Sequence, residues 1–185
     1  NIISQSIIDG RPYAIYGHSM GAMLAYEVTQ KLRENKMPLP VHVIFSGRGV
    51  PHRRSKNETI FHTMSDADFQ KEIAKLGGTP KEFFDHPELM EYLLPILKND
   101  FKISETATVW KDIRPFDFPI TIFMGKEEEE MEAEDVHGWM HHTNQTCVVY
   151  YFNGGHFFIN DQWETTAGII QKILMPGERM HKLSR

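Results

Sequence analysis

Three features that are scarce in this sequence limit what the protein can be. The 185 residues include one cysteine, Cys147, so no disulfide can form within the chain, and we expect a reducing, cytoplasmic location. No apolar run approaches the roughly 20 residues of a membrane-spanning helix, so we expect no membrane partner. Positive charge is not in excess, because 20 Lys and Arg stand against 25 Asp and Glu. Nothing therefore favours nucleic acid as a partner.

The composition is that of a globular protein. At 185 residues and 41% hydrophobic content, the chain is long enough for one domain with a substantial core and short for two. We therefore expect residues 1–185 to form a single domain. Repeats and low-complexity segments are absent apart from the acidic run Glu127–Glu130.

The most informative motif is a G-x-S-x-G sequence at Gly17–Gly21. It follows Tyr13–Tyr16, which reads as a short buried strand, and precedes Ala22–Leu32, whose apolar residues recur at helical spacing. This context is typical of the nucleophile elbow of α/β-hydrolases, where side chains at the flanking glycines would collide. The motif therefore predicts that Ser19 is a nucleophile at a helix N-terminus, where free N–H groups stabilise an oxyanion.

A nucleophilic serine needs a base, and in this fold the triad runs in the order Ser, Asp or Glu, His. Of ten histidines, His156 stands just beyond the last expected strand, Cys147–Phe152. The apolar Phe157–Ile159 is expected to hold its imidazole against the core, and His18, inside the elbow, is expected to shape the site. Other histidines lie in polar or helical surroundings and are expected at the surface: His52, His62, His86, His137, His141, His142 and His181.

The acid is sought after the strand Ile120–Met124, where the fold usually presents an Asp. Here the sequence continues into Glu127–Glu130, and the usual spacing selects Glu128, with Glu127 as the next candidate and the rest of the run solvated. Glutamate can orient an imidazole as aspartate does. The other position used in this fold, after the strand at 41–45, offers no carboxylate.

Residues 51–110 carry a helical pattern between the two halves of the expected sheet. Ser65 is expected to cap one helix that ends at Gly77–Gly78, a second stretch follows Pro80, and a third covers Pro87–Leu97. Helices inserted at this point of the fold form a lid, and the apolar side chains of such a lid suit an acyl chain, although most of them pack on the core.

Four segments together resemble the external, type II thioesterases of nonribosomal peptide and polyketide synthesis: Pro12–Met23, Leu76–Pro80, Glu134–Trp139 and Gly154–Ile159. The resemblance runs nearly end to end, and it implies an α/β-hydrolase fold, with a mostly parallel sheet flanked by helices and a helical lid inserted at about 51–110. It also implies hydrolysis of acyl or aminoacyl groups wrongly loaded on the phosphopantetheine arm of carrier proteins. Carried onto this sequence, the nucleophile falls on Ser19, the base on His156, and the acid, normally Asp, on Glu128.

The resemblance also bears on the oxyanion hole. Members of the family begin with further strands and a Gly-containing loop that donates one oxyanion N–H, whereas this sequence passes from Asn1 through a helix-like Ile2–Ile8 into the elbow strand. We therefore expect the N-terminal strands of the fold to be missing from the chain. The Met20 N–H is expected to be one oxyanion donor.

The predicted function is thioester hydrolysis through an acyl-serine intermediate, which requires no metal or organic cofactor. The expected partners are acyl or peptidyl carrier protein domains, and the expected state is a monomer. A basic patch near the site could dock an acidic carrier or simply be a solvated loop: Arg48, Arg53, Arg54 and Lys56. Two other functions stay open. One is a carboxylesterase or lipase acting on small free esters, and the other is an inactive homologue that binds carrier proteins.

Overall fold

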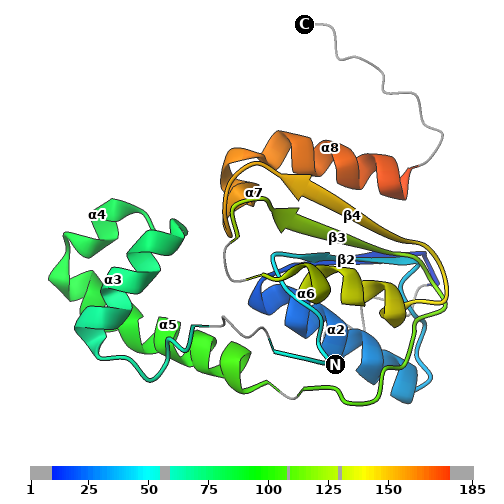
Figure 1. Ribbon diagram of the computed structural model, residues 1–185, viewed down its shortest axis with the longest axis horizontal. Coiled ribbons are helices and arrows are strands. Elements are labelled where there is room, and N and C mark those ends of the chain that lie inside the picture. Colours follow the sequence, from blue (N-terminus) through cyan, green and yellow to red (C-terminus); the bar gives the residue numbers. More distant parts are fainter. Residues whose placement is uncertain (1–9, 55–58, 108, 129–130, 176–185) are drawn as a thin grey trace, which may run out of the picture.

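The computed structural model describes residues 10–54, 59–107, 109–128 and 131–175. The helix-like Ile2–Ile8 therefore lies outside the described residues. In chain order the elements are β1 (Ala14–His18), α2 (Met20–Glu34), β2 (His42–Ser46), α3 (Asp66–Leu76), α4 (Lys81–Phe84), α5 (Pro87–Thr106), β3 (Ile120–Gly125), α6 (Ala133–His137), the 3₁₀ helix η1 (Gly138–His142), β4 (Cys147–Phe152), α7 (Phe158–Asp161) and α8 (Trp163–Leu174). Figure 1 shows this arrangement.

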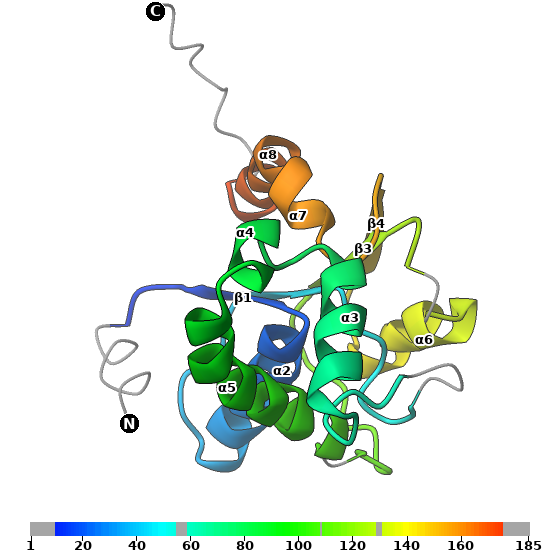
Figure 2. The ribbon, with the colours of Figure 1, turned by 90° about the vertical axis from the view of Figure 1, so that its left-hand side faces the viewer.

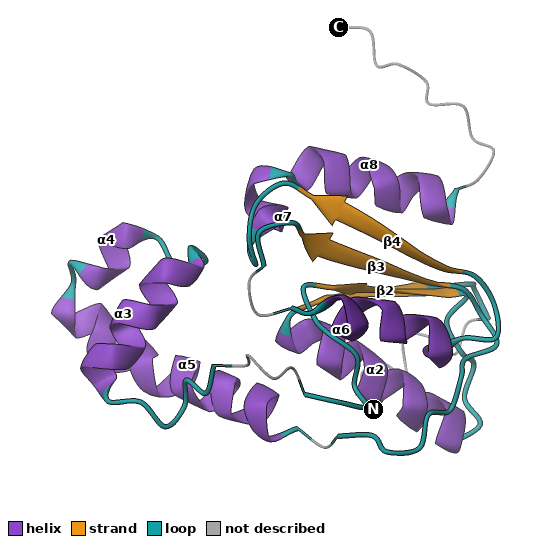
Figure 3. Cartoon of the chain, viewed as in Figure 1, coloured by secondary structure: helices purple, strands orange, loops and turns teal. Residues whose placement is uncertain are grey.

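The four strands form one parallel sheet in the order β1-β2-β3-β4. Parallel neighbours need crossover connections, and the helices supply them: α2 joins β1 to β2, α3–α5 join β2 to β3, and α6 with η1 joins β3 to β4. The helices α7 and α8 cover one face of the sheet, and α2 and α6 cover the other (Figure 3). The predicted α/β-hydrolase class, a parallel sheet flanked by helices, is confirmed.

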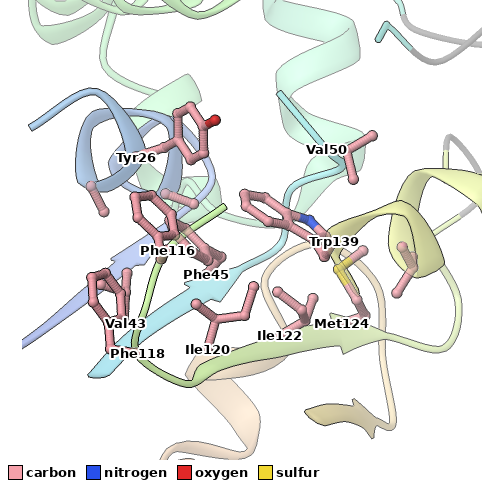
Figure 4. Close-up of a cluster of buried hydrophobic side chains, with 13 residues drawn as sticks. Tyr26, Val43, Phe45, Val50, Phe116, Phe118, Ile120, Ile122, Met124 and Trp139 are labelled. Carbon is pink, nitrogen blue, oxygen red and sulfur yellow. The ribbon is translucent and has the colours of Figure 1, made fainter. Parts of the chain in front are cut away.

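Each face of the sheet has its own hydrophobic core. On the α2 and α6 side, Phe45 stacks on Trp139 with ring centroids 4.3 Å apart (Figure 4). On the other side, Phe152 stacks on Phe158 at 4.7 Å. Strand β3 is buried along its whole length, because it lies inside the sheet with both faces covered, and this explains its continuous apolar sequence.

The elbow strand is confirmed, but its expected burial is wrong. Strand β1 lies at an edge of the sheet as described, and Tyr16 on it is 41% exposed. Its apolar residues reflect pairing with β2 and contact with α2, not enclosure on both faces.

The insertion between β2 and β3 is helical, as predicted. The Ser65 side chain accepts a hydrogen bond from the Asp68 N–H at 3.2 Å, and α3 ends at Gly77 with a left-handed φ of 77°. Helix α5 continues well past Leu97 to Thr106, with Pro95 inside it. A proline removes one intrahelical hydrogen bond, yet the helix continues from Pro87 to Thr106.

Helices α3 and α5 and the segment before α3 share a hydrophobic cluster made of Phe61, Phe69, Ile73, Met90 and Leu94, and Phe84 of α4 packs against it. Figure 1 shows these helices beyond the end of the sheet to which the strand arrows point, and in Figure 2 they lie in front of it. The buried carboxylate of Glu105, near the end of α5, accepts hydrogen bonds from the backbone N–H groups of Phe61 and His62 and contacts the His62 ring. This carboxylate therefore ties the start of the insertion to its end.

Long-range packing overturns one expectation about the histidines. His142, at the end of η1, is fully buried rather than exposed. Its Nδ1 lies 3.2 Å from the Tyr26 hydroxyl, and its Nε2 lies 2.8 Å from Nδ1 of His52. Both ring nitrogens thus have partners from distant segments, which makes burial of the imidazole tolerable.

The single cysteine lies on β4, in an environment that disfavours the thiolate. Cys147 is partly buried on β4, and burial raises the pKa of its thiol to about 11, so the thiol is a poor nucleophile. Helix α8 is the last element of the described chain, and with α7 it covers one face of the sheet. Among the described residues, no helix is both long and apolar enough to cross a membrane.

Burial of His142 predicts a pH-dependent stability. Burial, reinforced by the nearby His52 and His141, lowers its pKa to about 4. The unfolded chain takes up a proton at this residue near pH 6.5 and the folded chain does not, so the free energy of unfolding should fall between pH 6.5 and pH 4, by about 3 kcal/mol from this residue. Urea unfolding at several pH values should show that the free energy of unfolding falls less for His142→Gln than for the unchanged protein. An equal fall in both proteins would contradict the assignment of this pH dependence to His142.

Candidate active site

Ser19 occupies a sharp turn between β1 and α2. Its φ is 53° and its ψ is −118°, a conformation that residues with a Cβ rarely adopt. The turn is fixed from both directions: the Ser19 N–H donates to the carbonyl of Ser46 at 2.8 Å, and the Ser19 carbonyl accepts from the Ala22 N–H at 3.0 Å. Strain held in this way by surrounding hydrogen bonds is typical of a functional position.

The two glycines of the motif differ in what they do. A Cβ on Gly17 would lie 2.1 Å from the carbonyl oxygen of Gly21, so only glycine fits there. A Cβ on Gly21 would meet no described atom within 4 Å. The expectation of crowding is therefore wrong for Gly21. The backbone of Gly21 is instead what leaves no room for a side chain at Gly17.

The parallel strands bring three predicted residues together at one edge of the sheet. The Nε2 atom of His156 lies 2.9 Å from Oγ of Ser19, and its Nδ1 lies 2.6 Å from Oε1 of Glu128. The Glu128 side chain is 6% exposed and that of His156 is 20% exposed. The imidazole thus joins a hydroxyl and a buried carboxylate in one hydrogen-bonded chain.

The loops after β3 and β4 hold this chain in place. The Lys126 N–H donates to the carbonyl of Phe152 at 2.9 Å, and the Glu127 N–H donates to the carbonyl of Gly154 at 3.1 Å. The side chain of Glu127, the second candidate acid, is exposed. Glu129 and Glu130 lie outside the described residues. Of the four glutamates, Glu128 is the one whose side chain contacts His156 in the part of the chain that the structure describes.

His18 packs beside His156 without taking its place. The two ring centroids are 5.1 Å apart, and Nδ1 of His18 lies 2.9 Å from Oγ of Ser46. Burial, and secondarily the nearby His156, lower the pKa of His18 to about 4, so it is neutral at pH 7. It therefore adds no positive charge beside the His156 imidazole, consistent with the expectation that it shapes the site.

Met20 is the first residue of α2, so its N–H has no acceptor within the helix. That N–H and the positive end of the helix dipole are available for an oxyanion formed at Ser19. The sequence identifies no second oxyanion donor among the described residues.

The described arginines of the basic patch all contact other parts of the chain, although Arg54 is also exposed to solvent. Arg53 pairs with Glu132 at 2.7 Å and with Asp135 at 2.9 Å. Arg48 donates to the hydroxyl of Ser104 at 2.6 Å, and a further arginine, Arg54, donates to the carbonyl of residue 107 at 2.9 Å. These side chains brace the segment after β2 against α5 and α6. Lys56 lies outside the described residues.

Two further observations concern metal ligands and a cavity near the site. Within residues 10–54, 59–107, 109–128 and 131–175, no group of three or more His, Cys, Asp or Glu is arranged to hold a metal ion. A cavity of about 200 Å³ borders Glu128, but its lining includes neither Ser19 nor His156. That cavity is therefore not where a group attacked by Ser19 would bind.

Comparison with known proteins identifies the relatives of the chain. A family model described as a thioesterase domain matches residues 1–174. A curated relative, named linear gramicidin dehydrogenase LgrE, from Brevibacillus parabrevis, is 34% identical over 167 residues. The match covers 89% of this chain and 63% of LgrE. The chain therefore spans less than two thirds of the length of this relative.

Solved structures agree in fold and in sequence. ClbQ, from the colibactin NRPS/PKS pathway, aligns with a TM-score of 0.82 at 31% identity, covering 94% of this chain and 74% of ClbQ. YbtT, titled a type II thioesterase from the yersiniabactin NRPS/PKS pathway, aligns with a TM-score of 0.78 at 25% identity, covering 92% of this chain and 70% of YbtT.

The elbow geometry predicts opposite outcomes for its two glycines. Gly17→Ala should destabilise the protein by about 2 kcal/mol or more, because the added methyl group meets backbone that cannot move aside. Gly21→Ala, the matched control, should change stability by no more than about 1 kcal/mol, since its methyl group faces open space in a helix. Urea unfolding of both variants checks this. Equal destabilisation would contradict the one-sided crowding.

Proposed function

The chain belongs to the thioesterase family, and on that premise we propose that it hydrolyses acyl thioesters with Ser19 as nucleophile, His156 as base and Glu128 as the triad acid. The observation that carries this proposal is the hydrogen-bonded chain from Ser19 through His156 to Glu128, at 2.9 and 2.6 Å. These are distances at which a proton can pass from the hydroxyl to the imidazole.

The reaction proceeds in two halves. The Nε2 atom of His156 takes the proton of Ser19 as Oγ attacks the thioester carbonyl, and the Met20 N–H stabilises the oxyanion. The carbon–sulfur bond breaks, and the thiol leaves with the proton from His156. Water then attacks the acyl-serine as His156 removes its proton, and the carboxylic acid departs, which returns Ser19 to its starting state.

Glu128 acts through His156 and not on the substrate. Its Oε1 accepts a hydrogen bond from Nδ1–H of His156, which fixes the tautomer that leaves Nε2 free to accept a proton. The carboxylate also stabilises the imidazolium that forms in each half of the reaction. Because its side chain is 6% exposed, this stabilisation is little weakened by solvent.

The substrate we propose is an acyl group on the phosphopantetheine arm of a carrier protein. Two observations support it: ClbQ and YbtT, both named for NRPS/PKS pathways, share the fold over more than nine tenths of this chain, and an apolar helical insertion stands beside the sheet edge that holds Ser19. We propose that this insertion, α3–α5 within residues 51–110, is a lid over the acyl group.

The name of LgrE describes a dehydrogenase, which is a different reaction. A serine, an imidazole and a carboxylate in hydrogen-bonded sequence are the groups of acyl transfer, and none of them carries a hydride. We therefore base the proposal on the family and the site geometry rather than on that name.

Replacement of the nucleophile tests the reaction itself. Ser19→Ala should lower kcat for an acyl-carrier protein on the order of 10⁴-fold or more, because the attacking oxygen is lost. Binding of the acyl-carrier protein should persist, since the variant removes no docking contact. Release of free thiol and calorimetric binding measure the two effects. Full activity in the variant would refute the proposed mechanism.

The same assay separates a thioesterase from a general esterase. A carrier-directed enzyme should hydrolyse the acyl group faster from the carrier protein than from a free small ester or a short pantetheine thioester. Equal rates on all three would indicate a carboxylesterase, and an inert protein would indicate a binding homologue.

Neighbouring glutamates provide a matched test of the acid. Glu128→Gln should lower kcat roughly 10³-fold or more, because an amide neither stabilises the imidazolium nor enforces the correct tautomer. Glu127→Gln removes the same charge from an exposed position and should change kcat less than about twofold. The kcat values on one acyl-carrier substrate measure the difference. A loss at Glu127 instead of Glu128 would move the acid by one residue.

A further inference from the structure

The turn that follows α3 lies directly against the aromatic ring that follows His156. Gly77 ends the helix, and Gly78 comes next. A Cβ on Gly78 would lie 2.3 Å from both Cε2 and Cζ of Phe157 and 2.7 Å from Cε1. Ordinary carbon contacts are about 3.5–4.0 Å, so the bare backbone of the lid already occupies the space at the far end of this ring.

The same ring contacts both imidazoles of the site. Its centroid is 5.0 Å from that of His156, with the two planes perpendicular, and 5.9 Å from that of His18. His18 in turn lies 5.1 Å from His156. The lid turn, Phe157 and the proposed base therefore form one continuous series of packed contacts.

The position of His156 leaves little freedom for rotation. Its two ring nitrogens face Ser19 and Glu128 at the same time, and a hydrogen bond weakens steeply once its donor angle falls below about 120°. In a close-packed site, a displaced neighbour moves the groups it touches. A shift of the Phe157 ring is therefore felt by the imidazole.

We propose that Phe157 is a positioning residue through which the seating of the lid turn at Gly77–Gly78 sets the orientation of the His156 imidazole. This inference rests on the triad of the proposed function. With the lid seated as in the structure, Phe157 holds His156 between Ser19 and Glu128. When the turn lifts away, the ring gains room and the base loses its support, so the site is competent only under a seated lid.

A methyl group at Gly78 is the most direct perturbation. In the full-length protein, Gly78→Ala should push the far end of the Phe157 ring by about 1 Å and lower kcat roughly 10-fold to 10²-fold, with KM changed much less. The rate at which a small fluorophosphonate labels Ser19 should fall in parallel. Because that probe has no acyl chain for the lid to hold, the second readout separates base orientation from substrate binding.

The adjacent glycine is the matched control. Gly77→Asn places its Cβ where no described atom lies within 4 Å, and asparagine tolerates the left-handed conformation. Its kcat and labelling rate should stay within about twofold of the unchanged protein. Thermal unfolding of both variants confirms that each is folded under assay conditions.

Replacing Phe157 with a shorter side chain tests whether the effect of Gly78→Ala passes through the Phe157 ring. Phe157→Leu lacks the Cε1, Cε2 and Cζ atoms that the added methyl group meets, so Gly78→Ala should cost little further activity in that background. Alone, Phe157→Leu should lower kcat about fivefold to tenfold, and it remains informative even if Gly78→Ala fails to fold. If the double variant lost kcat by the product of the two single losses, the coupling would be wrong. An unchanged kcat in Phe157→Leu would also overturn it.

The outcomes for the coupling and for the proposed function are distinct. If Ser19→Ala kept thioesterase activity, the proposed function would fail whatever the glycine variants did. If Ser19→Ala were inactive while Gly78→Ala matched Gly77→Asn in both kcat and labelling rate, the function would stand and the coupling would be wrong.

Discussion

The parallel register of the four strands is the constraint on which the site depends. Because β1, β3 and β4 all end at the same edge of the sheet, the residues just beyond them meet there, although Ser19 and His156 are 137 positions apart in the chain. The loop after β3 then donates one backbone hydrogen bond to the end of β4 and one to the loop after β4, and these hold Glu128 beside His156. The sheet brings the groups together, and the loops adjust them to hydrogen-bonding distance.

Burial gives His156, His18 and His142 different surroundings. The His156 side chain is 20% exposed, and its Nδ1 contacts the buried carboxylate of Glu128. His18, packed beside it, has a pKa lowered to about 4 by burial and stays neutral at pH 7. His142 has a similarly lowered pKa but lies in the core, where it contacts Tyr26 and His52.

Local sequence signals were sufficient to predict the fold class and the residues of the candidate site. The glycines around Ser19, the strand before His156 and the spacing that selects Glu128 are each readable within a few residues, and the structure places all three side chains in contact, while their roles stay a prediction. What could not be predicted depends on partners distant in sequence. The burial of His142, the pairing of Arg53 with α6 and the contact between Gly78 and Phe157 each join segments that no local pattern relates.

Capture of the covalent intermediate tests the central claim most directly. An acyl-carrier protein mixed rapidly with the enzyme and quenched in acid should yield an acyl adduct, located by mass spectrometry on the peptide that contains Ser19. The account predicts that this adduct forms before free acid accumulates and disappears as water turns it over. Release of free acid with no adduct on Ser19, or an adduct on another residue, would contradict the account.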